Sequence, residues 1–269
     1  ESGVYTQFFG LTEKPFSITP DPRYLYMSRR HADALAHLIY GISQSGGFIQ
    51  LTGEVGTGKT TLVRSLLEQL PEEADVALIL NPELTTQEFL TTIAEELSVE
   101  LPTDGSTKSL VDRLSAHLLD AHARGRRTAL IVDEAQNLAT DVLEQVRLLT
   151  NLETPKQKLL QIILIGQPEL REVLDREDMR QLAQRVTGRY HLEPLSQDDT
   201  AKYLEHRMKV AGAPGAIFSK SAVREIFRWS KGVPRIINVI ADRSLLAAYT
   251  RYTRTVDRPL VKRAASEVY

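Results

Sequence analysis

A glycine-rich stretch, GEVGTGKT at residues 53–60, has the spacing of a phosphate-binding loop. Its glycines let the backbone turn its N–H groups toward phosphate oxygens, at the positive end of a following helix. Lys59 is expected to reach the β- and γ-phosphates, and the hydroxyl of Thr60 to ligate Mg²⁺. The loop alone does not name a reaction, because kinases, GTPases and motors share it. The predicted nucleotide-binding residues are Gly53, Glu54, Val55, Gly56, Thr57, Gly58, Lys59, Thr60 and Thr61.

Two adjacent carboxylates, Asp133 and Glu134, follow the apolar run at residues 129–132. At the carboxyl end of a parallel strand, Asp133 is expected to hold Mg²⁺ through water. Glu134 is suited to polarise a water molecule for attack on the γ-phosphate. A GTPase would usually carry an Asn/Thr-Lys-x-Asp motif, which the chain lacks. The pair therefore favours ATP hydrolysis over GTP hydrolysis or transfer to a small molecule.

A polar side chain, Gln167, follows the apolar run LQIILIG. If this strand lies between the strands that end at the P-loop and at Asp133, Gln167 is expected to sit between the γ-phosphate and the attacking water, as a sensor. Gly166 would allow the backbone to approach closely there. The alternative is a simple Gly-Gln-Pro turn before a helix.

Several arginines have positions from which they could contact phosphate. Arg180, Arg185 and Arg189 stand just before the fifth apolar run, and Arg185 and Arg189 are the preferred pair for a contact supplied to a neighbouring subunit. The alternative is that these side chains are only solvated. Arg235 begins a helix after a Gly-Val-Pro turn and is expected to link the nucleotide state to the position of the C-terminal helices.

The bulk composition is that of an ordinary globular protein. The chain has 269 residues, of which 42% are hydrophobic and 25% charged, with a net charge of −2. This balance gives no chain-wide basic field for nucleic acid, although a local patch remains possible. The absence of cysteine excludes disulfides, a thiol nucleophile and Cys-ligated metal sites. No run of about 18 apolar residues predicts a membrane span.

Strands alternating with amphipathic helical stretches predict an α/β fold with a parallel five-stranded sheet sandwiched by helices. The strand signals stop near residue 195, and helical periodicity continues to the end. The segment before the first strand is rich in proline and aromatic residues, and we expect it to pack against the sheet domain or a ligand. The expected strands are at 48–52, 76–80, 128–133, 160–166 and 189–194.

Three parts of the chain are predicted from these patterns. Residues 1–30 form an N-terminal segment that packs on the core, residues 31–195 form the nucleotide-binding domain, and residues 196–269 form a small all-helical lid. The chain begins ESGVY without a methionine and ends within helix-like sequence. We therefore expect it to be a domain of a longer protein.

The motifs together resemble those of an AAA+ ATPase. The P-loop, LIVDEAQ, LIGQPEL, RYHLEPL and GVPRIIN occur in the order typical of that family. The N-terminal block YTQFFGLTEKPFSITPDPRYLYMSRRHADALAHLIYGI is more specific: it resembles the type II (general) secretion pathway ATPase component A and its pilus-biogenesis relatives. The resemblance covers about residues 5–265.

The resemblance implies a cytoplasmic P-loop domain that uses ATP and Mg²⁺, with membrane attachment through a segment outside this chain. It implies a homo-oligomer, a ring or dimer in which an arginine completes the neighbour's site, and an inner-membrane partner protein in secretin assembly. It also implies an adenine contact by the N-terminal block, for which Phe16, Ile18 and His31 are candidates. His31 could equally be an ordinary helix N-terminal residue.

Two other functions remain open. One is a DNA-transposition regulator that forms ATP-dependent filaments on DNA, since its ATPase core would carry the same motifs. The other is a nucleotide-dependent scaffold that hydrolyses little ATP. The N-terminal block and the near-neutral charge favour the secretion ATPase over the first. Asp133, Glu134 and Arg235 favour it over the second, because a scaffold does not need the water-activating carboxylate.

Overall fold

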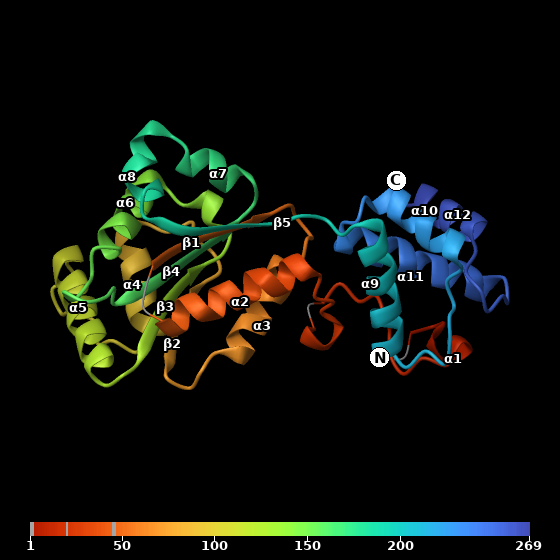
Figure 1. The fold of residues 1–269 in the computed structure, drawn as a ribbon, viewed down its shortest axis with the longest axis horizontal. Helices are drawn as coiled ribbons and strands as arrows, with labels where there is room; N and C mark the ends of the chain where they lie inside the picture. The colour runs from red at the N-terminus through yellow and green to blue at the C-terminus, as the bar shows by residue number, and fades with distance from the viewer. Residues whose placement is uncertain (1–2, 20, 45–46) are drawn as a thin grey trace. The chain divides into compact units, whose positions relative to one another are not determined.

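The computed structural model describes residues 3–19, 21–44 and 47–269, and five parallel strands form its sheet. The sheet order is β2-β3-β4-β1-β5 (Figure 1). This confirms the predicted fold, and β4 lies between β1 and β3 as the sensor prediction required. The strands are β1 Gly47–Gly53, β2 Ala74–Ile79, β3 Arg127–Val132, β4 Leu160–Gly166 and β5 Val186–Leu192.

Burial explains which strands the sequence predicts well. Every residue of β4 is buried, and so are all but the first of β1 and of β3. Such central strands are covered on both faces and read as continuous apolar runs. The edge strand β5 has a mixed pattern and begins at Val186, three residues before the predicted start. Its pairing with β1 begins at Phe48↔Val186 and shifts in register after that pair, which no apolar run signals.

Helices cover the sheet and join its strands. A cluster of buried apolar side chains joins α4, α5 and α6 to the strands, and Gly41 of α2 packs closely on Ile49 of β1. Figure 1 shows α2 passing in front of the sheet. The elements between the start of α2 and the end of β5 are α2 Arg29–Gln44, α3 Lys59–Gln69, α4 Thr86–Glu96, α5 Thr107–Ala123, the 3₁₀ turn η2 Ala135–Asn137, α6 Thr140–Leu149, α7 Glu169–Leu174, the 3₁₀ turn η3 Glu177–Met179 and α8 Arg180–Ala183.

The chain forms two compact units, which we describe separately. The sheet unit consists of residues 33–55 and 66–192. The helical unit consists of residues 56–65, 193–269 and the described part of 1–32. The boundary at 55/56 divides the predicted P-loop, so its first three residues belong to the sheet unit and the rest to the helical unit.

Four helices form the body of the helical unit. The N-cap Ser196 accepts a hydrogen bond from the backbone N–H of Asp199 at 3.1 Å, and this bond stabilises the start of α9. Pro234 at the first position of α11 supplies the fixed backbone angle favoured there. The helices are α9 Gln197–Val210, α10 Lys220–Ser230, α11 Pro234–Thr250 and α12 Arg258–Ser266, and the N-terminal elements are α1 Thr6–Phe9 and the 3₁₀ turn η1 Pro22–Tyr24.

The N-terminal segment packs differently from the sequence expectation. Its aromatic side chains do not cover the sheet: Tyr5, Phe9, Phe16 and Tyr24 join the buried cluster formed by α9–α12. Phe16, for example, meets Phe218 edge to face, with ring centroids 5.9 Å apart. Apolar periodicity predicts that such rings are buried but not which partner surface covers them.

A buried arginine, Arg207 on α9, holds this segment to the helices. Its side chain donates from Nε to the carbonyl of Pro15 at 2.6 Å and from Nη2 to that of Ser17 at 3.1 Å. Its guanidinium carbon lies 4.6 Å from the ring centroid of Tyr24, a cation–π contact. The arginine thus satisfies carbonyls of a segment that has no sheet or helix partner there.

Replacing Arg207 with methionine is expected to destabilise the helical unit by about 3 kcal/mol, because two carbonyls lose charged donors. Urea unfolding followed by the fluorescence of the single tryptophan, Trp229, measures this change. The exposed Arg224 provides a matched control, and Arg224→Met should change the free energy of unfolding by less than about 0.5 kcal/mol. Equal effects of the two variants would contradict the clamping role.

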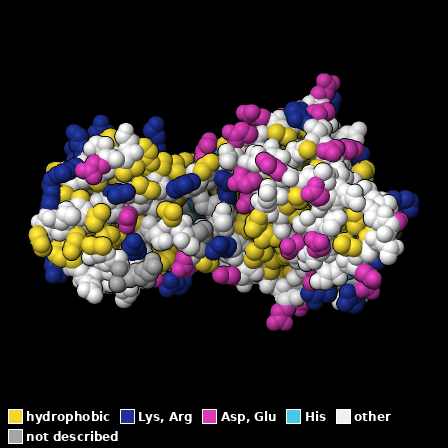
Figure 2. Space-filling view, turned by 180° about the vertical axis from the view of Figure 1, so that it is seen from behind, with side chains coloured by type: hydrophobic (Ala, Val, Ile, Leu, Met, Phe, Trp, Pro, Cys, Tyr) yellow, Lys and Arg dark blue, Asp and Glu magenta, His cyan; other side chains and the backbone are white. Residues whose placement is uncertain are grey.

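The surface charges of the two units differ. On the face drawn in Figure 2, Lys and Arg side chains are frequent over the helical unit, and Asp and Glu side chains over the sheet unit. Among the helices of the described ranges, none combines the length and apolar character needed to cross a membrane. Exposed basic residues from α10 to α12 include Arg224, Arg228, Arg251, Arg254, Arg258, Lys262 and Arg263.

Candidate nucleotide site

The P-loop has the backbone shape of a phosphate cradle. Gly56 and Gly58 have φ of 81° and 97°, a left-handed conformation that side-chain-bearing residues rarely adopt. Helix α3 begins immediately afterwards at Lys59, and its first intrahelical bond runs from the N–H of Leu62 to the carbonyl of Gly58 at 2.9 Å. The N–H groups of Thr60 and Thr61 precede that bond and point toward the helix N-terminus, where anions bind.

His31 supports this loop from the N-terminal segment. Its side chain is only 4% exposed, and Nε2 lies 3.2 Å from the carbonyl oxygen of Thr57. Burial lowers the pKa of His31, so the ring is neutral at pH 7. Because a carbonyl only accepts, Nε2 carries the proton, and Nδ1 accepts from the hydroxyl of Ser28. The predicted adenine contact of His31 stays a prediction, and the structure assigns both ring nitrogens to protein partners.

The start of α11 touches the P-loop directly. The backbone N–H of Arg235 donates to the carbonyl of Gly56 at 3.3 Å. A Cβ atom added at Gly56 would lie 2.6 Å from Cβ of Arg235, too close for any side chain. The sequence predicted that Arg235 links the nucleotide state to the position of the C-terminal helices, but the contact between its backbone and the loop was not predicted.

We expect Gly56→Ala to weaken ATP binding about tenfold or more, because the added methyl forces the P-loop and α11 apart. Gly125→Ala is the matched control, since Gly125 has φ of 75° and nothing within 4 Å of an added Cβ. That variant should show only the cost of a left-handed alanine, about 1 kcal/mol of stability. Thermal unfolding and an ATP titration of both variants separate the contact from the backbone strain. Equal losses of ATP affinity in the two variants would mean that the contact between Gly56 and Arg235 does not affect ATP binding.

The two predicted carboxylates lie at the end of β3 in the sheet unit. Asp133 continues the strand, with its N–H donating to the carbonyl of Ile79 at 2.8 Å. Its Oδ1 accepts from the N–H of Glu134 at 2.8 Å. Glu134 has φ 51° and ψ 36°, a left-handed conformation that costs roughly 1–2 kcal/mol for a residue other than glycine. Strain of this kind is typical of functional positions.

Gln136 connects this carboxylate to the predicted sensor, and sequence reasoning missed it. Its Nε2 donates to Oε2 of Glu134 at 2.5 Å, and its Oε1 accepts from the backbone N–H of Gln167 at 3.1 Å. The left-handed turn at Glu134 makes this return contact possible. The only signal in the sequence was an amide two residues after the carboxylate, in DEAQ.

Gly166 has a different neighbour from the one expected. An added Cβ would lie 2.6 Å from Oε1 of Gln136. The glycine therefore allows a close approach, as predicted, but the group that approaches is this amide.

The predicted arginines lie in the sheet unit, beside β5. Arg189 is exposed within the strand and donates from Nη2 to the carbonyl of Ala183 at 3.1 Å. Arg185 is half-buried, immediately before the strand. A contribution of Arg185 or Arg189 to a neighbouring subunit stays a prediction.

Phe16 and Ile18, the other two predicted adenine contacts, differ in their exposure to solvent. Phe16 is 3% exposed within the helical cluster, whereas Ile18 is 72% exposed. The structure gives these two side chains different environments, and a contact of either with the adenine stays a prediction.

The residues fit a nucleotide with Mg²⁺ in their chemistry. The glycine cradle and the start of α3 suit phosphate, and Lys59 supplies a cation beside them. A hydroxyl at Thr60 and a carboxylate at Asp133 suit Mg²⁺, which keeps several waters and takes few protein ligands. Lys59 and Thr60 belong to the helical unit and Asp133 to the sheet unit.

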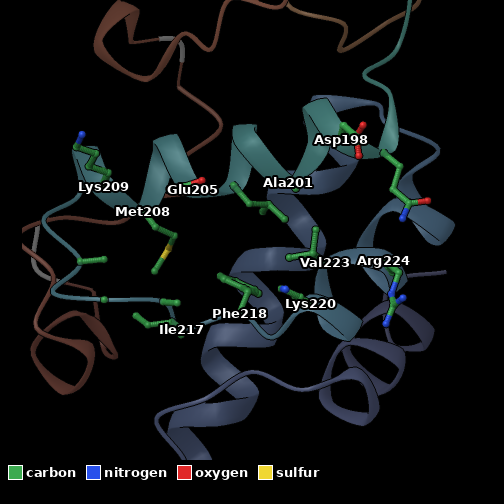
Figure 3. A pocket seen from close by; sticks show the side chains of 15 residues that line it. Asp198, Ala201, Glu205, Met208, Lys209, Ile217, Phe218, Lys220, Val223 and Arg224 are labelled. Carbon is green, nitrogen blue, oxygen red and sulfur yellow. The ribbon is translucent and has the colours of Figure 1, made fainter.

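A separate cavity of about 670 Å³ opens in the helical unit, between α9 and α10. Figure 3 shows Ala201, Met208, Phe218 and Val223 around it, with charged side chains such as Lys209 nearby. None of the predicted site residues lines this cavity.

Comparisons with known proteins show which family and which relative this chain resembles. A family model described as an AAA domain matches residues 42–174. General secretion pathway protein A of Aeromonas hydrophila is 53% identical over 265 residues, which are 98% of this chain and 48% of that protein. The chain thus spans about half the length of this curated relative.

Solved structures share the fold at low identity. The ORC2 protein of Aeropyrum pernix superposes with a TM-score of 0.70 at 19% identity, covering 94% of this chain and 71% of that one. Cdc6p of Pyrobaculum aerophilum gives 0.69 at 20% identity, covering 94% and 70%. The RuvB motor of Thermotoga maritima gives 0.59 at 15% identity, covering 90% and 69%. The chain therefore has the AAA+ fold, and it resembles general secretion pathway protein A.

Proposed function

We propose that this domain binds ATP with Mg²⁺ and hydrolyses it. Lys59 neutralises the β- and γ-phosphates, and the N–H groups at the start of α3 bind their oxygens. Thr60, and Asp133 through water, would hold Mg²⁺, which would supply positive charge to the phosphate oxygens. Glu134 accepts a proton from the attacking water at a carboxylate oxygen. Gln167 senses the γ-phosphate.

We further propose that hydrolysis switches the position of the C-terminal helices. The observation that carries this proposal is the contact between Gly56 and Arg235, which joins the phosphate loop to the first turn of α11. A change in the loop on phosphate release is passed to α11 through that contact. In this role the nucleotide-binding domain is formed by residues 31–195 and the lid by residues 196–269. The N-terminal segment that packs on the core is formed by residues 1–30.

The similarity to the relative from Aeromonas hydrophila suggests the cellular process in which this switch acts. Since 53% of the aligned residues are identical, we propose that this domain acts in assembly of a bacterial envelope machine, the type II secretion secretin or a pilus. It would work at the cytoplasmic face of the inner membrane, as a homo-oligomer with an inner-membrane partner protein.

Phosphate release from ATP tests the hydrolysis directly. We expect turnover with Mg²⁺, a loss of turnover when EDTA removes the metal, and restoration by added Mg²⁺. GTP should be a poorer substrate than ATP. No Mg²⁺-dependent release above a protein-free control would refute the proposed activity of this domain.

The same preparation separates the alternatives. ATP-dependent sedimentation with duplex DNA at physiological salt would favour the DNA-filament function, and the basic residues of α10–α12 would then be its contact surface. ATP binding without turnover, in the presence of Mg²⁺, would favour the scaffold.

A mixing experiment tests the arginine supplied in trans. Arg185→Ala or Arg189→Ala protomers, each inactive alone, are expected to regain part of their activity when mixed with Glu134→Gln protomers, because a mixed interface contains one complete site. Phosphate release against mixing ratio measures the restoration. Exposed Arg171→Ala protomers serve as the control and should be active without mixing. An absence of restoration with both variants would contradict a finger at these two positions.

A further inference from the structure

The amide of Gln136 lies between two groups with assigned roles. One end is hydrogen bonded to the carboxylate of Glu134 at 2.5 Å, and the other to the backbone N–H of Gln167 at 3.1 Å. The contact therefore joins the base position to the sensor position through a single side chain.

The orientation of this amide follows from its partners. A carboxylate only accepts hydrogen bonds, so the group facing Glu134 must be the NH₂ of Gln136. A backbone N–H only donates, so the group facing Gln167 must be the carbonyl. The assignment is unambiguous, and a flipped amide would lose both bonds.

The surroundings leave the amide little freedom. Gly166 presents no side chain to it, and an added Cβ there would lie 2.6 Å from Oε1 of Gln136. The backbone of η2 is closed by a bond from the N–H of Asn137 to the carbonyl of Glu134 at 3.0 Å. The segment after β4 is held in turn, because the N–H of Leu170 donates to the carbonyl of Gln167 at 2.9 Å. A movement of the backbone at Gln167 would reach the amide through the bond from its N–H to Oε1 of Gln136.

We propose that Gln136 is a positioning residue that couples the orientation of Glu134 to the backbone at Gln167. A shift of the segment after β4 changes the hydrogen bond at the carbonyl of Gln136, and its NH₂ group then turns the carboxylate of Glu134. The effect on turnover rests on the proposed hydrolysis, whereas the coupling itself exists without it.

A spectroscopic double-mutant cycle tests the coupling without any hydrolysis. In ¹H–¹⁵N spectra, Glu134→Ala should shift the backbone amide resonance of Gln167. The same substitution should leave that resonance unmoved in a Gln136→Met background, because methionine has similar length and no amide. The exposed Gln181→Met background is the matched control and should keep the response. An equal response in both backgrounds, or none in the parent chain, would overturn the inference.

Kinetics then separates the two ends of the amide. Gln136→Met should lower kcat about tenfold or more with KM for ATP within about twofold, the pattern of a misplaced catalytic group. Gln136→Glu keeps an acceptor for the N–H of Gln167 but faces Glu134 with a like charge. It should also lower kcat, while hydrogen exchange at the Gln167 amide stays slow in this variant and becomes faster in Gln136→Met.

The outcomes distinguish this inference from the proposed function. Coupling in the spectra together with no turnover by the parent chain would support the inference and refute the hydrolysis. Normal turnover in both Gln136 variants would overturn the inference and leave the hydrolysis standing. A purely structural role would lower the melting temperature of Gln136→Met without removing the response at Gln167, and that result would also overturn the inference.

Discussion

Glu134→Gln is expected to bind ATP normally and to lower kcat about 100-fold or more, because the general base is lost. Glutamine has nearly the same shape, and its side-chain oxygen can still accept the hydrogen bond from Gln136 that the structure assigns to Oε2. The geometry of the turn should therefore persist while the proton acceptor is removed. Single-turnover phosphate release and an ATP titration together separate chemistry from binding.

The control for this variant is Glu172→Gln, which neutralises an exposed carboxylate of the same unit on α7. Its turnover should stay within about twofold of the parent, since Glu172 is exposed and has no hydrogen-bond role in the proposed chemistry. Near-normal turnover of Glu134→Gln would mean that another residue positions the water.

Lys59→Ala is expected to weaken ATP binding about 100-fold or more, because a charged hydrogen bond to the phosphates is lost. Lys59 is 8% exposed at the first position of α3, so the phosphate charge would be left without its buried cation. A titration with ATP measures the affinity without turnover, and ADP should lose less affinity because it lacks the γ-phosphate.

The exposed Lys220, at the first position of α10, gives the matched control. Lys220→Ala removes the same charge from the same unit at an equivalent helix position, and its ATP affinity should stay unchanged. If ATP binds Lys59→Ala as tightly as the parent, the P-loop has no part in binding.

The central strands could be predicted because they are buried on both faces. The runs that became β3 and β4 are continuous apolar stretches, and their ends placed Asp133 and Gln167 correctly at strand ends. The edge strand β5 was less predictable, because its pattern is mixed and its pairing contains an irregularity at Phe48/Ile49. The apolar pattern of a sequence indicates which residues are buried. An edge strand is less buried than a central strand, so its pattern is weaker.

The side-chain contacts of the site could not be predicted to the same extent. The spacing of the motifs was sufficient to identify Lys59, Asp133 and Glu134 as candidate site residues. The bridge by Gln136 depends on the left-handed backbone of Glu134, and no residue in the sequence marks that conformation, since glycine or asparagine would be usual there. The approach of Arg235 to Gly56 joins residues far apart in the chain and depends on tertiary packing alone.

The N-terminal segment shows the same limit. Its aromatic residues predicted burial, and burial was found, but on α9–α12 and not on the sheet. Arg207 is buried at this contact, although the charge of an arginine would ordinarily predict exposure. Only the complementary carbonyls of Pro15 and Ser17, brought together by the fold, explain why this arginine is inside.

The left-handed backbone of Glu134 has a consequence for engineering. Glycine at this position would relieve the strain and reduce the cost of the turn, yet it would remove the carboxylate. A screen for thermostability that does not measure turnover would therefore select glycine at position 134. The selected variant would be more stable, but it would lack the carboxylate proposed to act as the general base. Engineering of more thermostable variants of this domain should therefore keep Glu134 and introduce stabilising substitutions at other positions.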